Sequence, residues 1–352
     1  MTHLPKPIIT EGEKSTVTIE GEIPQENWEK HRTVSLKALG SELSVPGFRK
    51  GHAPEDILVK YIGEYELLRE MAERALAEHY GTLLVEHRID AIGRPEVTIT
   101  KLSKGNPLGF KITTTVLPKV TLPDYTSLAA LAVKDKASED PIVTDEEAET
   151  FINNLLSQRV KAAAENDGKE APEELTDEVA KSIGDFKDAA DMRARVKEGM
   201  LLDKKRMQRE ERRMAIIDAL LKDTKVTIPD ILVESELSKI LAQFENDLTR
   251  MGIEPKDYRE KVGKDEAALR AEFRGDAEKR AKIQLILNEI GVAEKLTPSP
   301  EEVQKEVDHL LAHHPPHEGH DEARERESAL IYVTTVLTNE KVLAFLEQQK
   351  DA

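Results

Sequence analysis

The sequence predicts an α+β N-terminal domain, a small antiparallel sheet with helices, followed by an all-α C-terminal domain with helical arms in an elongated, multi-domain molecule. Three observations predict this fold class. Apolar and polar residues alternate at residues 16–20 and again at 97–116, as in strands with one buried face. From Thr144 onward, apolar residues recur at helical spacing nearly to the end. The 352 residues, 39% of them apolar, suffice for two or three domains with separate cores.

Residues 1–118 are expected to form the α+β domain. Val17 and Ile19 mark the inner face of a first strand, and Pro24 opens a helix that is expected to end near Gly40. Further helices are expected at 54–62 and from about 64 to 84. Strands around 97–99 and 110–116, joined by a turn at 104–107, complete the domain.

The rest of the chain divides into a connector and a helical region. Pro118, Pro123 and the small residues at 127–132 predict an extended linker over 119–143. Residues 144–352 are expected to be the helical domain, with helices beginning near 144, 188, 229, 265 and 299 and closing helices beyond 330. The middle of the second of these, 203–213, is charged on nearly every side except at Met207, which predicts projection into solvent.

Charge and composition exclude several classes of protein. The net charge of -17 argues against a general coat for DNA or RNA, which needs clustered cations. Residues 1–118 contribute only -2 of this charge, so a front part that docks on an anionic partner is compatible with the distribution. No cysteine is available for disulfides or metal thiolates. Neither a signal peptide nor an apolar stretch of about 20 residues is evident, so a cytoplasmic protein with no membrane partner is expected.

Signals for catalysis are missing from the sequence. No phosphate-binding loop, nucleophile elbow or dinucleotide fingerprint is present, so no cofactor is expected. His309 and His313 have the i, i+4 spacing of metal ligands and open a histidine-rich tract that ends at His320. Prolines and a glycine interrupt this tract, and no glutamate stands between the two histidines as in zinc peptidases. Adventitious metal binding is therefore favoured over a physiological metal site.

The most informative segment is the loop Val-Pro-Gly-Phe-Arg-Lys-Gly-His-Ala-Pro at residues 45–54. Glycines and prolines on both sides predict a tight, exposed turn. At its tip, Arg49 and Lys50 can pair with phosphates or carboxylates, and Phe48 can enter an apolar pocket or stack on a base. A solvated turn whose phenylalanine packs back onto its own domain is an equally good interpretation of these residues alone.

The motif Gly-Phe-Arg-Lys-Gly-x-x-Pro at 47–54 resembles the ribosome-docking signature of the trigger factor family. Residues 89–95, 110–120, 174–178 and 223–229 are also similar to that family, whereas positions 52 and 53 depart from its commonest form. The resemblance implies a bacterial-type, ATP-independent chaperone that docks beside the exit tunnel of the large ribosomal subunit, on protein and RNA, and holds unfolded nascent polypeptides. It leaves room for a homodimer when the protein is free. The ribosome contact would rest on Gly47, Phe48, Arg49, Lys50 and Gly51.

The resemblance also draws attention to a missing module. Relatives usually carry a β-rich prolyl isomerase domain between the connector and the helical arms. Here only the 18 residues of 157–174 separate the first long helix from the next family-like segment. Because so short a stretch cannot form a sheet around a proline pocket, isomerase activity is predicted to be absent.

Apolar side chains of the helices are the candidate contacts for an unfolded client. The candidates are Leu237, Leu241, Phe244, Met251, Leu310, Leu311, Val333 and Leu337. For each of them singly, a place in a helix–helix core is favoured, because that is the usual role of an apolar stripe. An alternative function is a ribosome-free module that uses the same helices to hold a folded partner or to assemble a complex. An enzyme with a catalytic metal on the histidine tract is a third reading.

Overall fold

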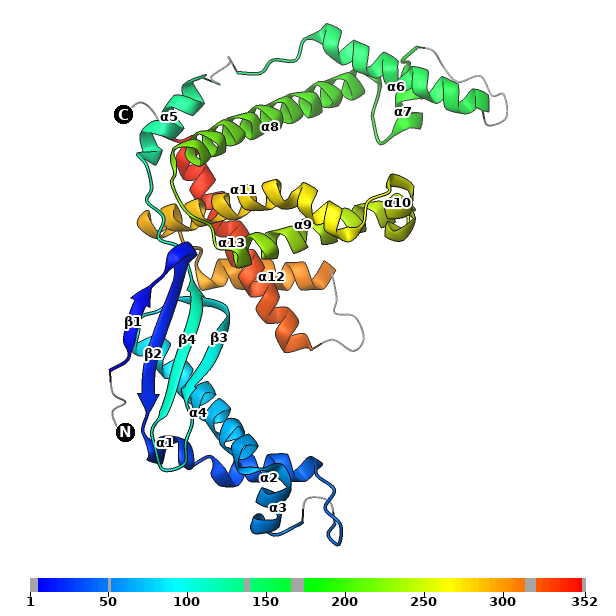
Figure 1. Ribbon diagram of the computed structural model, residues 1–352. Helices are drawn as coiled ribbons and strands as arrows, with labels where there is room; N and C mark the ends of the chain where they lie inside the picture. The colour runs from blue at the N-terminus through cyan, green and yellow to red at the C-terminus, as the bar shows by residue number, and fades with distance from the viewer. Residues whose placement is uncertain (1–5, 50–51, 136–139, 166–173, 314–320, 350–352) are drawn as a thin grey trace. The chain divides into compact units, whose positions relative to one another are not determined.

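The computed structural model describes residues 6–49, 52–135, 140–165, 174–313 and 321–349 (Figure 1). Contacts divide the chain into two compact units, each made of two stretches. The first unit comprises Met1–Thr121 and Lys225–Lys282, and the second comprises Leu122–Thr224 and Ile283–Ala352. This division groups part of the expected helical domain with the N-terminal residues.

A four-stranded antiparallel sheet is the centre of the N-terminal stretch. Its order is β1 (Ile8–Glu11), β2 (Thr16–Ile23), β4 (Leu108–Val116) and β3 (Ala91–Lys101). The register sets Ile19 opposite Ile112, so the inward-facing residues of neighbouring strands meet on one face. The alternation in the sequence therefore predicted the central strands, whereas the short edge strand β1, whose residues are all exposed, was not predicted.

Four helices accompany this sheet: α1 (Gln25–Glu29), α2 (Arg32–Glu42), α3 (Glu55–Ile62) and α4 (Glu64–His87). The helical stretch expected from Pro24 to Gly40 is present as two helices, because the chain turns at residues 30–31 between α1 and α2. The buried Trp28 ring anchors α1, where its Nε1 donates to the carbonyl oxygen of Asn106 at 3.1 Å. On α2 the buried apolar residue is Leu36, while Val34 is exposed.

The core of this stretch lies between the sheet and the helices. Its fully buried members include Ile19, Ile23, Trp28, Leu67, Met71, Leu83, Leu108 and Ile112. All buried members of this cluster lie between residues 17 and 112. Gly63, at φ +87°, ends α3 and begins α4 in a conformation that favours glycine, as the sequence predicted for the end of that helix.

The expected extended linker is wrong over residues 125–135, where the structure has helix α5 (Tyr125–Asp135). Asp124 accepts hydrogen bonds from the backbone N–H and the hydroxyl of Ser127, which stabilises the first turn. Ala129, Ala130 and Ala132 are buried, and α5 packs against α8 and α13. The alanines that suggested a flexible connector thus have high helix propensity and form a close-packing face.

The second unit is helical. Besides α5 it contains α6 (Asp145–Glu165), α7 (Asp177–Ile183), α8 (Ala189–Asp223), α12 (Pro300–His313) and α13 (Glu322–Glu347). The predicted capping boxes are confirmed: Thr144 and Glu147 exchange hydrogen bonds at α6, and Ser299 and Glu302 do so at α12. Ile152, Leu156 and Met192 form a core of α6–α8.

An ion-pair network joins α8 to α13 at the end of the charged segment 203–213, whereas most residues of that segment are exposed, as expected for a helix that faces solvent. Arg213 is buried and donates two hydrogen bonds of 2.9 Å to the carboxylate of Glu340. Its Nε donates to Glu347, which also pairs with Arg209. The carboxylate partners come from a helix more than 120 residues away in sequence, so the charge pattern of α8 alone did not reveal them.

The first unit also contains a helical hairpin formed by α9 (Asp230–Arg250), the short α10 (Pro255–Val262) and the first part of α11 (Glu266–Ala293) (Figure 1). α9 ends at Gly252 as predicted, with φ +74°. Helix α10 was not predicted, and α11 continues two residues past Gly291. Val233, Leu237, Ile240 and Ala277 are the buried core of the hairpin.

By length and composition alone, α13 could cross a membrane, contrary to the expectation from the sequence. Ala329 and Val333 pack against α12, and Glu340 and Glu347 hold Arg213 of α8. These contacts give α13 the role of a core helix in the second unit.

Candidate functional site

The loop between α2 and α3 begins with a tight turn. The backbone N–H of Phe48 donates to the carbonyl oxygen of Val45 at 3.1 Å, and Gly47 has φ +86°. Proline followed by a glycine at positive φ is the signature of a type II turn. Pro46 and Gly47 therefore fix the direction in which Phe48 leaves the domain.

The two ends of the loop are fastened to the core. Val45 is buried in it, and Ala53 packs against it. Behind the loop, a Cβ at Gly40 would meet the Leu58 side chain at 3.0 Å, so α2 and α3 approach closely. Arg32 donates to Glu55 at 3.1 Å between the same two helices. The loop is thus held by a packed helix pair.

The tip of the loop is accessible. The Phe48 side chain is 40% exposed, and Arg49 is exposed as well. Arg49 forms no ion pair with another residue that the structure describes. Lys50 and Gly51, which the sequence also assigned to this site, lie outside the described residues. The exposed Phe48 departs from the alternative in which its ring packs onto its own domain.

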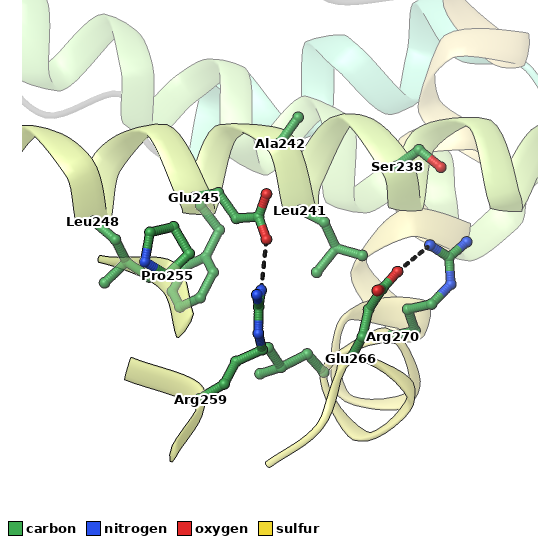
Figure 2. A pocket seen from close by; sticks show the side chains of 11 residues that line it. Ser238, Leu241, Ala242, Glu245, Leu248, Pro255, Arg259, Glu266 and Arg270 are labelled. Atoms are coloured by element: carbon green, nitrogen blue, oxygen red, sulfur yellow. Dashed lines mark hydrogen bonds and ion pairs between the residues drawn. The ribbon is translucent and has the colours of Figure 1, made fainter. Parts of the chain in front are cut away.

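A second candidate site is a pocket of about 250 Å³ at the tip of the α9–α11 hairpin (Figure 2). Leu241, Phe244 and Leu248 of α9 and Leu269 of α11 supply its apolar lining. The Phe244 ring contacts Tyr258 of α10 edge-on, with centroids 5.3 Å apart. The pocket is bounded by all three helices, and its lining combines these apolar side chains with polar and charged ones, Ser238, Glu245, Arg259, Glu266 and Arg270.

Charged side chains stand around this pocket (Figure 2). Arg259 of α10 and Glu245 of α9 form an ion pair of 2.7 Å, and Arg270 lies 3.7 Å from Glu266. Arg270 also donates to Glu234 at 2.5 Å, and this bond holds the pKa of the Glu234 carboxyl below its usual value. Arg270 is thus fixed mainly by Glu234, and its contact with Glu266 is loose.

The eight candidate client contacts are not equivalent. Leu237 and Val333 are buried in helix–helix cores, so their assignment to a client surface is wrong for the folded protein. The α12–α13 core that contains Val333 is also contacted by three half-buried side chains, Leu310, Leu311 and Leu337. Leu241 and Phe244 line the pocket, and Met251 beside it is 74% exposed. Leu237 and Val333 therefore have the usual role of an apolar stripe on a helix, which is packing in a core.

Other exposed apolar side chains were missed by the sequence reasoning. They include Met214 on α8, Ile331, Tyr332 and Val336 on α13, and Ile253 and Val262 near the pocket. Met207, noted in the sequence only as the exception in a charged helix, is 62% exposed. Met207 could have been recognised from the sequence, because it is a lone methionine among charged residues. The exposed residues of α13 could not, because apolar residues occur on all sides of that helix.

The histidine tract gives no metal site within the described residues. His309 is exposed on α12, and its Nδ1 lies 4.0 Å from Glu306. His313 ends the same helix, but its side chain lies outside the description, as do residues 314–320. Among the side chains that are described, no group of three His, Cys, Asp or Glu could hold a metal ion.

A fastened loop with an exposed aromatic and cationic tip, together with helices that expose apolar side chains, defines a protein that binds other macromolecules. Residues 8–181 match the family model described as bacterial trigger factor protein, and residues 188–348 match the model of its C-terminus. The two ranges together cover nearly all of the sequence. The chain belongs to the trigger factor family of bacterial chaperones.

Individual relatives agree with this assignment. Trigger factor from Moorella thermoacetica is 25% identical, over 85% of this chain and 84% of its own length. The Anoxybacillus flavithermus trigger factor is 26% identical, over 86% and 89% respectively. A solved structure described as "Promiscuous Substrate Recognition in Folding and Assembly Activities of the Trigger Factor Chaperone" shares the fold, with a TM-score of 0.56. It is 16% identical and covers 97% of this chain and 99% of that chain.

Proposed function

We propose that this protein is an ATP-independent chaperone that docks beside the exit tunnel of the large ribosomal subunit and holds unfolded nascent chains in the cytoplasm. The observation that carries the docking is the α2–α3 loop, where Phe48 is exposed and Arg49 has no described partner. A guanidinium without an internal partner is available for phosphate or carboxylate groups of the ribosome. The fastened ends of the loop reduce the entropy lost on binding.

An acidic protein can still use such a tip on an RNA-rich surface. Screening at physiological ionic strength limits repulsion from distant carboxylates to a Debye length of about 8 Å. The N-terminal 118 residues hold 15 basic and 17 acidic side chains, so the strong negative charge lies elsewhere in the chain. The net negative charge of the chain therefore does not exclude binding of Arg49 to an anionic surface.

Charge reversal of the loop tests this docking. Arg49→Glu combined with Lys50→Glu is expected to lower cosedimentation with purified ribosomes about tenfold or more, because attraction to phosphate becomes repulsion. Lys279→Glu with Arg280→Glu is the matched control, since it makes the same charge change at exposed positions on α11. Docking through this loop is wrong if both double variants cosediment like the parent protein.

The missing isomerase domain is part of the same proposal. Helix α6 ends at Glu165 and α7 begins at Asp177, so only residues 166–176 separate them. The alignment with the Moorella protein spans 377 positions, whereas 85% of this chain is about 299 residues. About 78 positions of that alignment therefore have no residue from this chain, roughly the size of a small domain.

A ribosome-free interaction module remains the alternative for the helices. It predicts that the protein binds a folded partner equally well with and without the loop substitutions. Suppressed aggregation of a chemically unfolded protein, without added nucleotide, would favour the chaperone over that module.

A further inference from the structure

We propose that the pocket between α9, α10 and α11 binds one large apolar side chain of an unfolded polypeptide, and that α10 is its lid. This inference rests on the proposed holding of unfolded chains, and it assigns one site and one class of ligand to that activity. The pocket lies wholly within the first unit of the chain.

The size and lining of the pocket define the ligand. Its volume of about 250 Å³ is below the range of about 300–1,000 Å³ that is common for small-molecule and cofactor sites. Leu241, Phe244, Leu248 and Leu269 form the apolar part of its lining, while the charged side chains of the lining are engaged in ion pairs, Arg259 with Glu245 and Arg270 with Glu266. A single leucine-sized or phenylalanine-sized side chain matches such a space, with the peptide backbone left at the charged rim.

The surroundings favour an extended chain as the source of that side chain. Met251 and Ile253, which lie in sequence between the lining residues Leu248 and Pro255, are both exposed. They add two exposed apolar side chains to the segment that connects α9 to α10, and methionine adapts well to varied contacts. Residues 225–282 hold 12 basic and 13 acidic side chains, so this part is nearly neutral within a chain of net charge -17. Polypeptide segments with a net positive or a net negative charge can therefore approach the pocket.

Helix α10 has the features of a lid. Gly252 and Gly263 flank it, both at positive φ, and neither has an atom within 4 Å of where a Cβ would lie. A Schellman motif ends α9 before the first of these glycines, with Ile253 N–H donating to the Leu248 carbonyl oxygen at 2.9 Å. Helix α10 itself buries none of its residues. The turns on both sides can thus absorb a rotation of α10 without unpacking a core.

Two contacts close this lid over the pocket. Arg259 reaches across to Glu245 (Figure 2), and the Tyr258 ring lies edge-on against the Phe244 ring. The ion pair is partly exposed, and such pairs contribute little to stability. Opening therefore exchanges a weak polar contact and one ring contact for a larger accessible apolar surface.

Methyl NMR can test the pocket directly. The chain has 7 methionines, and Met251 beside the pocket is identified by comparison with Met251→Leu. The probe is a ten-residue Gly/Ser peptide with one central Phe, and the same peptide with Ala is the control. We expect the Phe peptide to shift the Met251 signal with an affinity on the order of millimolar, as one anchor side chain allows. The Ala peptide should leave the signal unmoved.

Two tryptophan variants locate the binding. Ala242 is exposed and lines the pocket, so Ala242→Trp should fill its mouth and abolish the shift caused by the Phe peptide. Ala271 is exposed on α11 outside the lining, and Ala271→Trp should retain the shift. The pocket proposal fails if Met251 responds equally to both peptides, responds to neither, or still responds in Ala242→Trp. If these results occur while the protein still prevents aggregation of an unfolded polypeptide, the chaperone function stands without this site.

Hydrogen exchange tests the lid. Arg259→Gln removes the ion pair and should speed exchange of the α10 amides by up to about fivefold, the range expected for an exposed pair. Lys261→Gln, on the same helix, makes the same charge change and should leave exchange unaltered. The lid is overturned if Arg259→Gln exchanges like the parent protein, or if the Phe peptide leaves α10 exchange unchanged.

Discussion

Gly47 is the single residue on which the geometry of the docking loop depends most directly. Its φ of +86° lies in the region that side chains with a Cβ disfavour, and no atom lies within 4 Å of where its Cβ would be. Backbone strain is therefore the main effect of a substitution there. This one turn sets the direction in which the side chains of Phe48 and Arg49 point.

We expect Gly47→Ala to introduce a strain of about 1 to 2 kcal/mol in the turn. The loop should leave its type II geometry, and ribosome affinity in cosedimentation should fall several-fold. Gly81→Ala, at an exposed position inside α4, is the control, since alanine favours a helix. Equal ribosome affinity of Gly47→Ala and the parent protein would contradict a preformed loop.

Arg213 joins α8 to α13, so its loss should destabilise the second unit. Its side chain is 9% exposed, and its partner Glu347 is 15% exposed. Arg213→Ala should lower the free energy of unfolding by about 2 to 3 kcal/mol. This is less than for a fully buried pair, because Glu340 is 55% exposed and Arg209 still pairs with Glu347.

Urea unfolding of Arg213→Ala measures this effect. Arg206→Ala on the same helix is the control, since Arg206 pairs only with Asp203 among the described residues and is well exposed. Its change should stay within about 0.5 kcal/mol. Similar losses in both variants would mean that the network across α8 and α13 adds nothing specific.

At the scale of elements, the N-terminus of α12 carries a pH-dependent cap. The Lys341 ammonium, together with the backbone N–H and hydroxyl of Ser299, lowers the pKa of Glu302 to about 2. A folded-state pKa below the unfolded one stabilises the fold above the unfolded value near 4.5. This contribution is lost as the pH falls from about 4.5 to 2.

Comparison of Glu302→Gln with the parent protein checks this cap. The parent should unfold at a higher temperature near pH 6, and the difference should shrink as the pH falls toward 2. Glu301→Gln, at the exposed neighbouring position, should show no such dependence. A difference that is constant with pH would exclude the titration of Glu302 as its cause.

Sequence patterns within a few residues predicted most helices and strands. The remaining elements depend on contacts with residues that are distant in the sequence. Thr144 and Ser299 fixed helix starts because each cap is complete within four residues. The break after α1 depends on Trp28 reaching Asn106, which no local pattern reveals. Pro255 at the start of α10 was a local signal that the sequence reasoning overlooked.

The candidate sites follow the same division. The exposure of the 45–54 loop could be predicted from its motif, because glycine and proline determine a turn within four residues. Leu237 and Leu241 look alike in the sequence, yet one is buried in the hairpin core and the other lines the pocket. The pocket itself could not be predicted, because α10 approaches α9 only through tertiary contacts such as the Tyr258–Phe244 ring pair.

At the scale of the whole molecule, binding is expected to proceed without peptide-bond isomerisation. The protein should not accelerate the proline-limited refolding of a denatured test protein, while an added prolyl isomerase should. The reason is that residues 166–176 are too few to form a catalytic domain between α6 and α7. A rate that rises in proportion to the concentration of pure protein would overturn this prediction.

The core of the sheet and the ion-pair network between α8 and α13 differ in when they can be completed during synthesis. The core of the sheet uses residues 17–112 alone, so it can assemble once the first third of the polypeptide has emerged. Arg213 of α8, by contrast, takes its ion-pair partners from α13, where Glu340 and Glu347 follow it by 127 and 134 residues. During much of its own translation, a new copy therefore has a finished α2–α3 loop and an incomplete α8–α13 network. Under the proposed docking function, it is able to bind at its own tunnel exit before it is able to serve any other chain.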